Sequence, residues 1–486
     1  MVIQLVSSAQ KMPVNDVNVK EGFVAFRTSQ GLELRGSVVH LTRHSASIEV
    51  YNPEPVIRSS EVLQDFCVRM GEETVYGGRA LVQQVVNTGS VLLCSVVLED
   101  SSFDAQYLAR QSDGGPLRER FAGFMQQWGQ TWRVLPGFKV AVADMQTLLL
   151  DLRLWMGQIE LGLQSGAPHA LAAREREAVD QLSPVVVPVL NAVFERFERE
   201  YRRLAPEQCP EHRSYVQRHL HPLVLCAPFA YRSYVKPLGY AGDYEMVDMM
   251  LRDPREGASL FAKVFNVWLL QQDSAAAHRN RIKYLTRKLV ETAGSAARAG
   301  RRARILNLGC GPAREIQDFM AQSVLSDWAE FTLLDFNEET LRHAQAALER
   351  EQQRHGRSTL VQVQKKSVQQ LLKDALRAAP TPQGANYDLI YCAGLFDYLD
   401  DRTCRRLLGF FHQLAAPEGR VLATNVAPST PNRGSLELIL DWHLIYRDAA
   451  QVERLCPESI PSESVRVESE ATGQNIFLEI RKDDAR

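Results

Sequence analysis

The chain has 486 residues, of which 45% are hydrophobic and 23% are charged, and its formal net charge is -2. A chain of this length is too long for one compact hydrophobic core, so we expect two or three domains. The near balance of charge excludes the bulk attraction to nucleic acid or anionic lipid that a strongly basic chain has. The eight cysteines occur singly, without a CxxC pair. This favours reduced thiols in the cytoplasm over disulfides or a zinc site.

Two further features bear on localisation. The N-terminal stretch MVIQLVSSAQKMPVND lacks a basic region followed by a long apolar run, so we expect no signal peptide. The most apolar internal run, 182–194, is short and contains Pro184 and Pro188, so we expect no membrane span.

The N-terminal hundred residues are predicted to form short strands. The segments are rich in Val, Leu and Ile, and Gly, Asn, Pro and Ser separate them. They cover 22–28, 32–41, 47–51, 61–69, 76–86 and 90–98. The pattern predicts a small all-β barrel or sandwich within residues 1–111.

A helical region is predicted at 117–300, after the linker-like sequence Ser112-Asp113-Gly114-Gly115-Pro116. Apolar residues recur at helical spacing in five segments of this region. These segments are 117–163, 169–204, 246–250, 260–270 and 278–292. Segment 231–245 matches neither a simple helix nor a strand. We expect the long helices to form a homodimer interface and to offer apolar surface for a substrate.

Strands and helices alternate in residues 301–486. The predicted strands are 305–308, 330–335, 360–366, 387–392 and 419–425, and the helices are 313–323, 338–355, 368–378 and 400–414. Such alternation predicts a doubly wound parallel sheet. Two closing strands, 464–471 and 475–482, predict a terminal hairpin. The expected fold class is therefore multidomain: an all-β barrel, a helical region and an α/β Rossmann-like domain.

A glycine-rich turn follows the first strand of this last domain, in the sequence Ile305-Leu306-Asn307-Leu308-Gly309-Cys310-Gly311-Pro312-Ala313. Glycine at such a turn lets a ligand approach the backbone closely. A dinucleotide fingerprint needs a third glycine where Arg314 stands. The small Ala313 instead fits the GxGxG form of methyltransferases, and Asp335 ends the second strand, where an acidic residue holds ribose hydroxyls.

The order of these features resembles S-adenosylmethionine-dependent methyltransferases of the Rossmann-like class, and S-adenosyl-L-methionine is the expected cofactor. The resemblance implies a binding site made of Asn307, Gly309, Gly311, Pro312, Asp335, Asn337, Ser367 and Val368. Asn307 departs from the usual pattern, which has an acidic residue there. An amide accepts a hydrogen bond but supplies no charge to the methionine amino group. The alternative is a Rossmann-like fold whose ligand has been lost.

From Cys226 to the end the chain resembles the PhcB-type family of methyltransferases. The resemblance is carried by 234–244 (YVKPLGYAGDY), 306–312 (LNLGCGP), 396–399 (FDYL) and 442–447 (WHLIYR). It implies synthesis of a fatty acid methyl ester, 3-hydroxypalmitic acid methyl ester, which serves as a diffusible quorum-sensing signal in bacteria. We expect Tyr234, Gly242 and Asp243 to help cover the cofactor. The alternative is that the tyrosines of this segment pack in the core.

The N-terminal barrel resembles in part a PilZ domain, the receptor module for cyclic di-GMP. Residues 40–46 (HLTRHSA) lie where that module has (D/N)xSxxG, but His40, Thr42 and Ser45 replace its defining residues. No RxxxR precedes them to grip phosphates. We therefore expect a degenerate PilZ-like module used for packing or partner contact.

A fatty carboxylate is ionised at neutral pH, so its esterification needs a cation and an apolar tunnel more than a strong base. Cations in the family-like segments are candidates for holding it, although each can equally form a salt bridge: Arg232, Lys236, Arg279, Arg281 and Arg447. Asp397, Tyr398 and Tyr240 are the candidate catalytic residues. Asp397 can otherwise cap the helix predicted at 400–414.

Three functions remain open at this point. The first is O-methylation of a fatty or 3-hydroxy fatty acid, and the second is methylation of an amine or phenol with Asp397 or a tyrosine as base. The third is a regulatory protein that senses S-adenosylmethionine without turnover. His219 and His221 lack further ligands nearby, so we expect no metal. We expect no nucleic-acid substrate, because no basic stripe or NPPY-like motif occurs.

Overall fold

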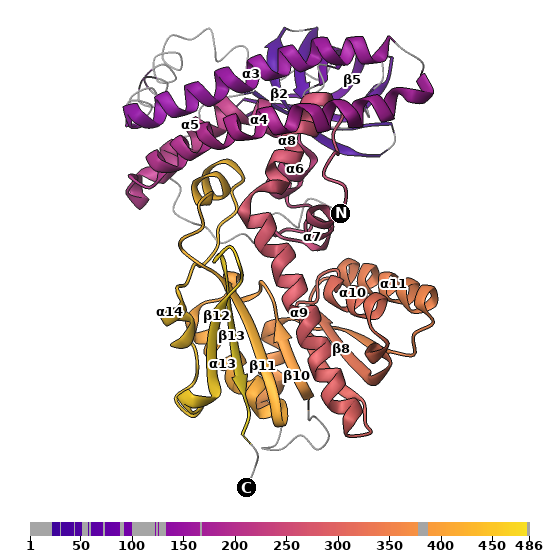
Figure 1. The fold of residues 1–486 in the computed structure, drawn as a ribbon. Coiled ribbons are helices and arrows are strands. Elements are labelled where there is room, and N and C mark those ends of the chain that lie inside the picture. Colours follow the sequence, from indigo (N-terminus) through magenta and orange to yellow (C-terminus); the bar gives the residue numbers. More distant parts are fainter. Residues whose placement is uncertain are drawn as a thin grey trace. The chain divides into compact units, whose positions relative to one another are not determined.

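The computed structural model describes residues 22–29, 31–42, 44–50, 57, 60–70, 73–87, 92–99, 122, 125, 133–165, 168–377 and 387–483 (Figure 1). The chain divides into two compact units. One contains residues 1–162, 203–226 and 257–262, and the other contains 163–202, 227–256 and 263–486. The predicted helical region contributes to both units, and the division into domains 1–111, 117–300 and 301–486 stays a prediction.

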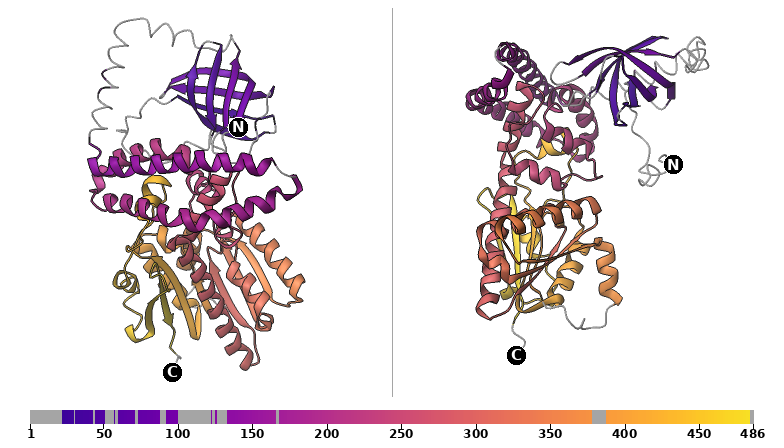
Figure 2. Two further views of the ribbon diagram at one scale, coloured as in Figure 1. Left: turned by 45° about the horizontal axis from the view of Figure 1, so that its top comes forward. Right: turned by 90° about the vertical axis from the view of Figure 1, so that its right-hand side faces the viewer.

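Six antiparallel strands of the first unit close into a barrel in the order β1-β2-β3-β6-β5-β4 (Figure 2). They are β1 (Gly22–Arg27), β2 (Glu33–Leu41), β3 (Ser45–Val50), β4 (Val62–Met70), β5 (Glu73–Asn87) and β6 (Leu92–Leu98). Buried and less buried residues alternate along β3 and β6 because successive side chains point to opposite faces. The predicted barrel is confirmed, and its likeness to PilZ stays a prediction.

Two helices of the same unit are α3 (Pro136–Gln164) and α5 (Cys209–Val224). The fully buried His212 joins them, since its Nε2 accepts a hydrogen bond from Leu135 N at 3.0 Å. Its ring also lies 4.8 Å from that of Phe138. Most of the predicted helical stretch before Arg133 falls outside the described residues.

The second unit begins with the helical segments α4 (Leu171–Tyr201), α6 (Pro228–Val235) and α7 (Tyr244–Leu251). Helix α8 (Leu260–Gln271), most of which belongs to this unit, precedes the long α9 (Asp273–Arg298). The expectation for 231–245 was wrong in part, because α6 extends to Val235. Helix α7 begins at Tyr244, and residues 236–243 between the two helices form a turn in which Lys236, Gly239 and Gly242 adopt positive φ.

A seven-stranded sheet follows, with order β12-β13-β11-β10-β7-β8-β9. Its strands are β7 (Ala303–Leu308), β8 (Ala329–Asp335), β9 (Leu360–Lys365), β10 (Tyr387–Cys392), β11 (Ala415–Val426), β12 (Val465–Ser469) and β13 (Asn475–Arg481). The first five strands are parallel, whereas β13 runs antiparallel to both β11 and β12. The predicted α/β domain with a terminal hairpin is thus confirmed.

Helices cover both faces of the sheet, as the right-hand view of Figure 2 shows. One face packs against α9, α10 (Arg314–Gln322) and α11 (Glu338–His355). The other packs against α12 (Val368–Arg377), α13 (Asp401–Leu414) and α14 (Ala449–Glu453). Because β7, β10 and β11 are parallel, their carboxyl ends meet at one edge, where ligands bind in such sheets.

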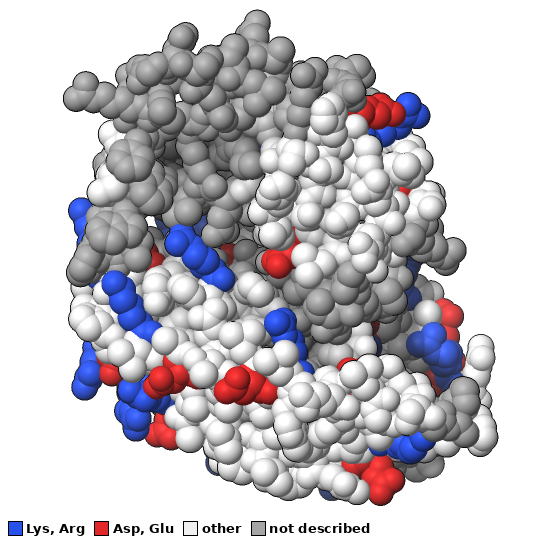
Figure 3. All heavy atoms as spheres, turned by 90° about the horizontal axis from the view of Figure 1, so that it is seen from above, with Lys and Arg blue, Asp and Glu red and all other residues white. Residues whose placement is uncertain are grey.

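Charged side chains of both signs are scattered among uncharged ones on the face drawn in Figure 3. Within the described residues no helix has the length and apolar character needed to cross a membrane. The described residues likewise contain no group of three or more His, Cys, Asp or Glu side chains placed to hold a metal ion.

Candidate functional site

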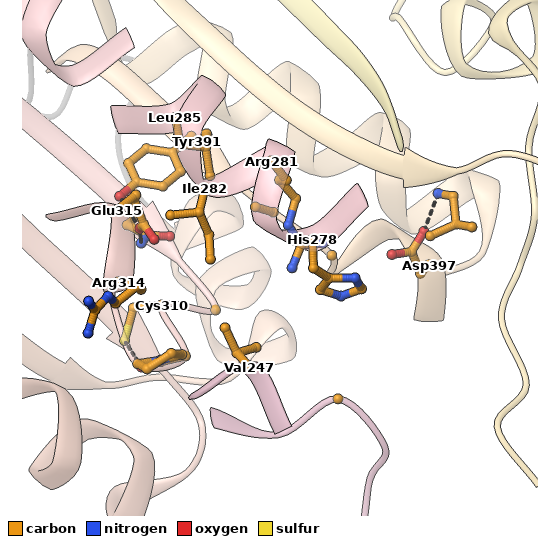
Figure 4. Close-up of a pocket in the computed structure, with 18 of the residues that line it drawn as sticks. Val247, His278, Arg281, Ile282, Leu285, Cys310, Arg314, Glu315, Tyr391 and Asp397 are labelled. Carbon is orange, nitrogen blue, oxygen red and sulfur yellow. Dashed lines mark hydrogen bonds between the residues drawn. The ribbon is translucent and has the colours of Figure 1, made fainter. Parts of the chain in front are cut away.

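A pocket opens at the carboxyl edge of the sheet, between the ends of β7, β10 and β11 and the N-terminal half of α9 (Figure 4). Its empty volume is about 740 Å³, which includes space that is open to solvent. In Figure 4, Glu315 and Tyr391 lie on one side and Asp397 on the other, with Arg281 and His278 between them.

The glycine turn forms the floor beside β7. Gly309 and Gly311 have φ of 70° and 52°, a left-handed conformation that glycine adopts without strain. A Cβ at Gly311 would meet no atom within 4 Å, so this backbone faces open space. Gly309 N donates to Leu334 O at 2.7 Å, which ties the turn to β8. The turn therefore exposes backbone where a ligand can approach it.

Asp335 ends β8 beside this turn and is buried. Its Oδ1 accepts from Asn337 N at 2.9 Å, and its Oδ2 accepts from Gly311 N at 3.4 Å. Burial raises the pKa of the carboxyl, and the hydrogen bonds from Asn337 and Gly311 lower it. The bonds fix the carboxylate next to the exposed turn, and its part in holding a ribose stays a prediction.

Asn307 provides the test of whether the pocket fits S-adenosylmethionine. Its side chain is 2% exposed and lines the pocket. Its Nδ2 donates to Glu315 Oε1 at 3.2 Å, while its Oδ1 is buried without a hydrogen-bond partner among the described residues. A buried acceptor without a partner is costly unless a ligand or water supplies a donor. The amino group of the methionine part of S-adenosylmethionine is such a donor, so Asn307 fits this cofactor.

The remaining predicted cofactor contacts lie at the same edge but serve local structure. Asn337 caps α11, because its side chain accepts from Thr340 N at 3.1 Å. Ser367 exchanges hydrogen bonds with Gln370 just before α12, which begins at Val368. Pro312 lines the pocket. The part of these residues in cofactor binding stays a prediction.

The segment 236–243 reaches the pocket at Gly242 and is held in place by hydrogen bonds. Asp243 is buried, and its carboxylate accepts hydrogen bonds from Arg232 Nε at 3.0 Å and from Arg232 Nη2 at 2.8 Å. It also accepts a hydrogen bond from Met246 N and thereby caps α7. Tyr398 donates its hydroxyl to Ala241 O at 3.0 Å and accepts Trp442 Nε1 at 2.9 Å. Tyr398 is thus engaged in holding this segment.

Gly242 is the residue of this segment that lines the pocket. A Cβ there would lie 3.1 Å from the ring of Trp442, and the φ of 75° disfavours any other residue. Tyr240 packs against Phe336 with ring centroids 5.2 Å apart, and burial raises its pKa to about 12. Tyr234 lies half-buried on α6, and burial raises its pKa as well.

Four of the predicted carboxylate-binding cations are engaged elsewhere. Arg232 pairs with Asp243, and Lys236 Nζ contacts Asp441. Arg279 Nη1 donates to the carbonyl oxygens of Met250 and Leu270. Arg447 is buried and donates to Asn425 Oδ1, to the carbonyl oxygens of Phe396 and Leu399, and to Asp401. The structure does not gather these side chains around one site.

Arg281 is different. Its side chain is 7% exposed and lines the pocket, yet it has no hydrogen bond or ion pair with any described residue. Burial lowers its pKa, and the charges of Asp397 and Glu315 raise it. Its Nη1 lies 2.9 Å from the place where a Cβ at Gly394 would stand, which explains the glycine there. The pocket therefore contains a buried cation without a partner in the described chain.

Asp397 lies on the opposite side of Arg281 from Glu315 (Figure 4), and its side chain is 3% exposed. Its Oδ1 accepts from Val426 N at 2.7 Å. Burial raises the pKa of its carboxyl to about 7, against the effects of the Val426 hydrogen bond and of Arg281 and Arg447. The helix-cap alternative was wrong, because Asp400 caps α13 through Thr403 N at 2.8 Å.

His278 and Glu315 also line the pocket, and neither was predicted from the sequence. His278 Nδ1 contacts Ser274 O at 2.9 Å, and burial lowers the pKa of the imidazole to about 3, so the ring is neutral. The spacing of His278, Arg281, Ile282 and Leu285 places them on one face of α9, a signal that the sequence contains. Glu315 accepts from Tyr391 OH at 2.7 Å.

Comparisons with known proteins address the same region. Residues 306–421 match the family described as a methyltransferase domain. Among solved structures, a possible exported protein from Bordetella parapertussis is 15% identical, with 72% of this chain and 99% of that chain covered and a TM-score of 0.39. The N-methyltransferase NodS from Bradyrhizobium japonicum, solved with S-adenosylhomocysteine, is 14% identical, covering 49% and 97%, with a TM-score of 0.29.

The magnesium protoporphyrin IX methyltransferase of Synechocystis, solved with bound S-adenosylmethionine, is 12% identical, with 43% and 82% covered and a TM-score of 0.30. These TM-scores lie below 0.5, so the structural similarities carry no argument. No curated protein matches the sequence. The matched domain contains the glycine turn and Asp335, and the chain is an S-adenosylmethionine-dependent methyltransferase.

Proposed function

We propose that this methyltransferase esterifies the carboxylate of a fatty or 3-hydroxy fatty acid and releases a methyl ester. One observation carries the proposal: Arg281 is buried in the pocket and has no hydrogen bond or ion pair with any described residue. Leaving an ionised group buried and unpaired is costly. A planar carboxylate matches the donors of a guanidinium and would relieve that cost.

The chemistry needs little from the protein beyond alignment. Bound S-adenosylmethionine supplies an electrophilic methyl group on its sulfonium. Arg281 would hold the acceptor carboxylate and leave one of its oxygens free for in-line attack. An ionised carboxylate needs no general base, which agrees with the full engagement of the Tyr398 hydroxyl.

Apolar side chains beside Arg281 support an acyl substrate. Ile282 and Leu285 follow it on α9, and Val247 and Leu444 also line the pocket. They offer apolar surface to the first carbons of an acyl chain. The fatty and 3-hydroxy character of the acid rests on the resemblance of segments 234–244 and 442–447 to PhcB-type enzymes.

Methylation of an amine or hydroxyl group is the second candidate. It is favoured by Asp397, whose pKa is raised to about 7 by burial. A carboxylate that titrates near neutral pH suits a general base. Its second oxygen has no hydrogen bond to any residue of the described chain, so it is free to accept a proton from a substrate.

A direct test compares acceptors that differ only in the reacting group. Purified protein is given labelled S-adenosylmethionine with fatty and 3-hydroxy fatty acids of several lengths, and with the amide, alcohol and amine of each. The proposal predicts that acids are the best substrates by kcat/KM. Faster methylation of the amine or alcohol would move the assignment to the second candidate. Donor binding without any product would indicate a sensor.

A further inference from the structure

The donor side of the pocket contains a polar network that the glycine turn does not explain. Asn307 at the end of β7 presents an Oδ1 that is buried and has no partner among the described residues. Glu315, in the first turn of α10, also lines the pocket and is 7% exposed. Both side chains are polar and buried, and they line the pocket together with Gly309 and Gly311. Such groups require partners.

Hydrogen bonds fix the orientation of the Asn307 and Glu315 side chains. Glu315 Oε1 accepts from Tyr391 OH at 2.7 Å and from Asn307 Nδ2 at 3.2 Å. An ionised carboxylate only accepts, so the amide must turn its NH₂ group toward Glu315. Asn307 Oδ1 is thereby left as the free acceptor of the pair. The Glu315 carboxylate therefore supplies a negative charge, and Asn307 Oδ1 supplies a free hydrogen-bond acceptor.

We propose that Glu315 and Asn307 together bind the ammonium group of the methionine part of the cofactor, with Glu315 as the source of negative charge and Asn307 Oδ1 as hydrogen-bond acceptor. From the sequence, Asn307 was expected to leave this ammonium without a charged partner. The structure provides such a charge eight residues later, across an Asn307–Glu315 hydrogen bond. This inference concerns the donor site and does not depend on the nature of the acceptor.

Other charged groups near Glu315 define the competing explanation. Arg281 is the cation that acts on it, and Asp318 is a like charge on the same helix. Burial raises the pKa of Glu315, and its hydrogen bond with Tyr391 lowers it. Glu315 would have a purely structural role if it only balanced the charge of Arg281. Any test must separate that role from binding of an ammonium.

The test measures binding by calorimetry, without acceptor and without turnover. Two ligands are compared: S-adenosylhomocysteine, which has the amino group, and 5′-methylthioadenosine, which lacks the whole amino-acid part. For Glu315→Gln we expect the Kd for S-adenosylhomocysteine to rise about tenfold or more, as for loss of a charge-assisted hydrogen bond. The Kd for 5′-methylthioadenosine should change by less than about twofold, since it makes no such bond.

Moving the charge provides a second, independent test. Asn307→Asp alone places two carboxylates at hydrogen-bond distance and should weaken binding, because both cannot be ionised cheaply. The double variant Asn307→Asp/Glu315→Gln returns one charge to the pair and should bind S-adenosylhomocysteine within about threefold of the native protein. Asn307→Ala, which keeps Glu315, should weaken only the ligand with the amino group. These variants remain informative if Glu315→Gln alone fails to fold.

Three results would overturn the proposal. One is a Glu315→Gln protein that binds S-adenosylhomocysteine as the native protein does. Another is an equal loss of affinity for both ligands, which would indicate a structural role. The third is recovery of binding in Glu315→Gln/Arg281→Met, because Glu315 would then only balance Arg281. A failed carboxylate assay would leave these measurements unaffected.

Discussion

Replacement of Arg281 by Met tests the acceptor site through two opposite effects. The side chain is 7% exposed and has no hydrogen bond within the described residues, so its charge is uncompensated except at a distance. An unsatisfied buried polar group costs about 1–3 kcal/mol, and more when charged. Met fills similar space without a charge. We therefore expect Arg281→Met to be more stable by about 1 kcal/mol or more, a rise in Tm of about 2–4 °C.

Activity should move the other way. A guanidinium holds a carboxylate by two charge-assisted hydrogen bonds, each contributing about 1.5–3 kcal/mol. Losing both corresponds to a fall in kcat/KM for acid acceptors of roughly two to four orders of magnitude. Binding of S-adenosylhomocysteine should stay within about threefold, because Arg281 faces the acceptor. Melting curves, initial rates and calorimetry on one preparation measure all three quantities.

Arg279→Met is the matched control, two residues earlier on α9. Arg279 Nη1 donates to Leu270 O at 3.0 Å and to Met250 O at 3.2 Å, so its loss should lower stability. The acceptor kinetics should change far less than in Arg281→Met. This role of Arg281 would be excluded if Arg281→Met kept its kcat/KM within about threefold, or if it lost stability as Arg279→Met does.

Three more outcomes are expected. Asp335→Ala should raise the Kd for S-adenosylhomocysteine by about tenfold or more, because a buried carboxylate that accepts from Gly311 N is removed; an unchanged Kd would speak against the ribose role. Glu198 is 4% exposed and accepts from Gly434 N and Ser435 N at 2.7 Å each, so Glu198→Ala should lower stability by about 2–4 kcal/mol in melting experiments. Burial raises the pKa of Asp397 to about 7; the ionised form competes with an acid for Arg281, so kcat/KM for acids should fall as pH rises through about 7. Asp397→Asn should flatten that profile, whereas a rise with pH would favour Asp397 as a base.

Local patterns predicted much of the fold. The six barrel strands and the alternating strands and helices after Arg304 could be predicted from the spacing of apolar residues and from the glycines between the segments. Both signals depend only on residues that are close in the sequence. The glycine turn and Asp335 were found for the same reason. The helix over 228–235 was missed within an irregular segment because eight residues carry little periodicity and Gly239 and Gly242 dominate the pattern.

The acceptor site was harder to predict. From the sequence, Arg281 was only one of five candidate cations, because the lack of a partner is a tertiary property. Arg232 and Arg447 are engaged by residues 11 and 22 positions away in the sequence, which no local pattern indicates. Glu315 was missed since an acidic residue in a first helical turn is explained by the helix dipole alone.

The position of the transferred methyl group distinguishes a carboxylate acceptor at Arg281 from an amine or hydroxyl acceptor. The protein is incubated with methyl-labelled S-adenosylmethionine and a fatty acid, the organic phase is extracted, and the product is treated with dilute alkali. A methyl ester releases its label as volatile methanol, and the label should be nearly absent with Arg281→Met. Label that stays bound after alkali would mark an ether or N-methyl product and contradict a carboxylate acceptor at Arg281.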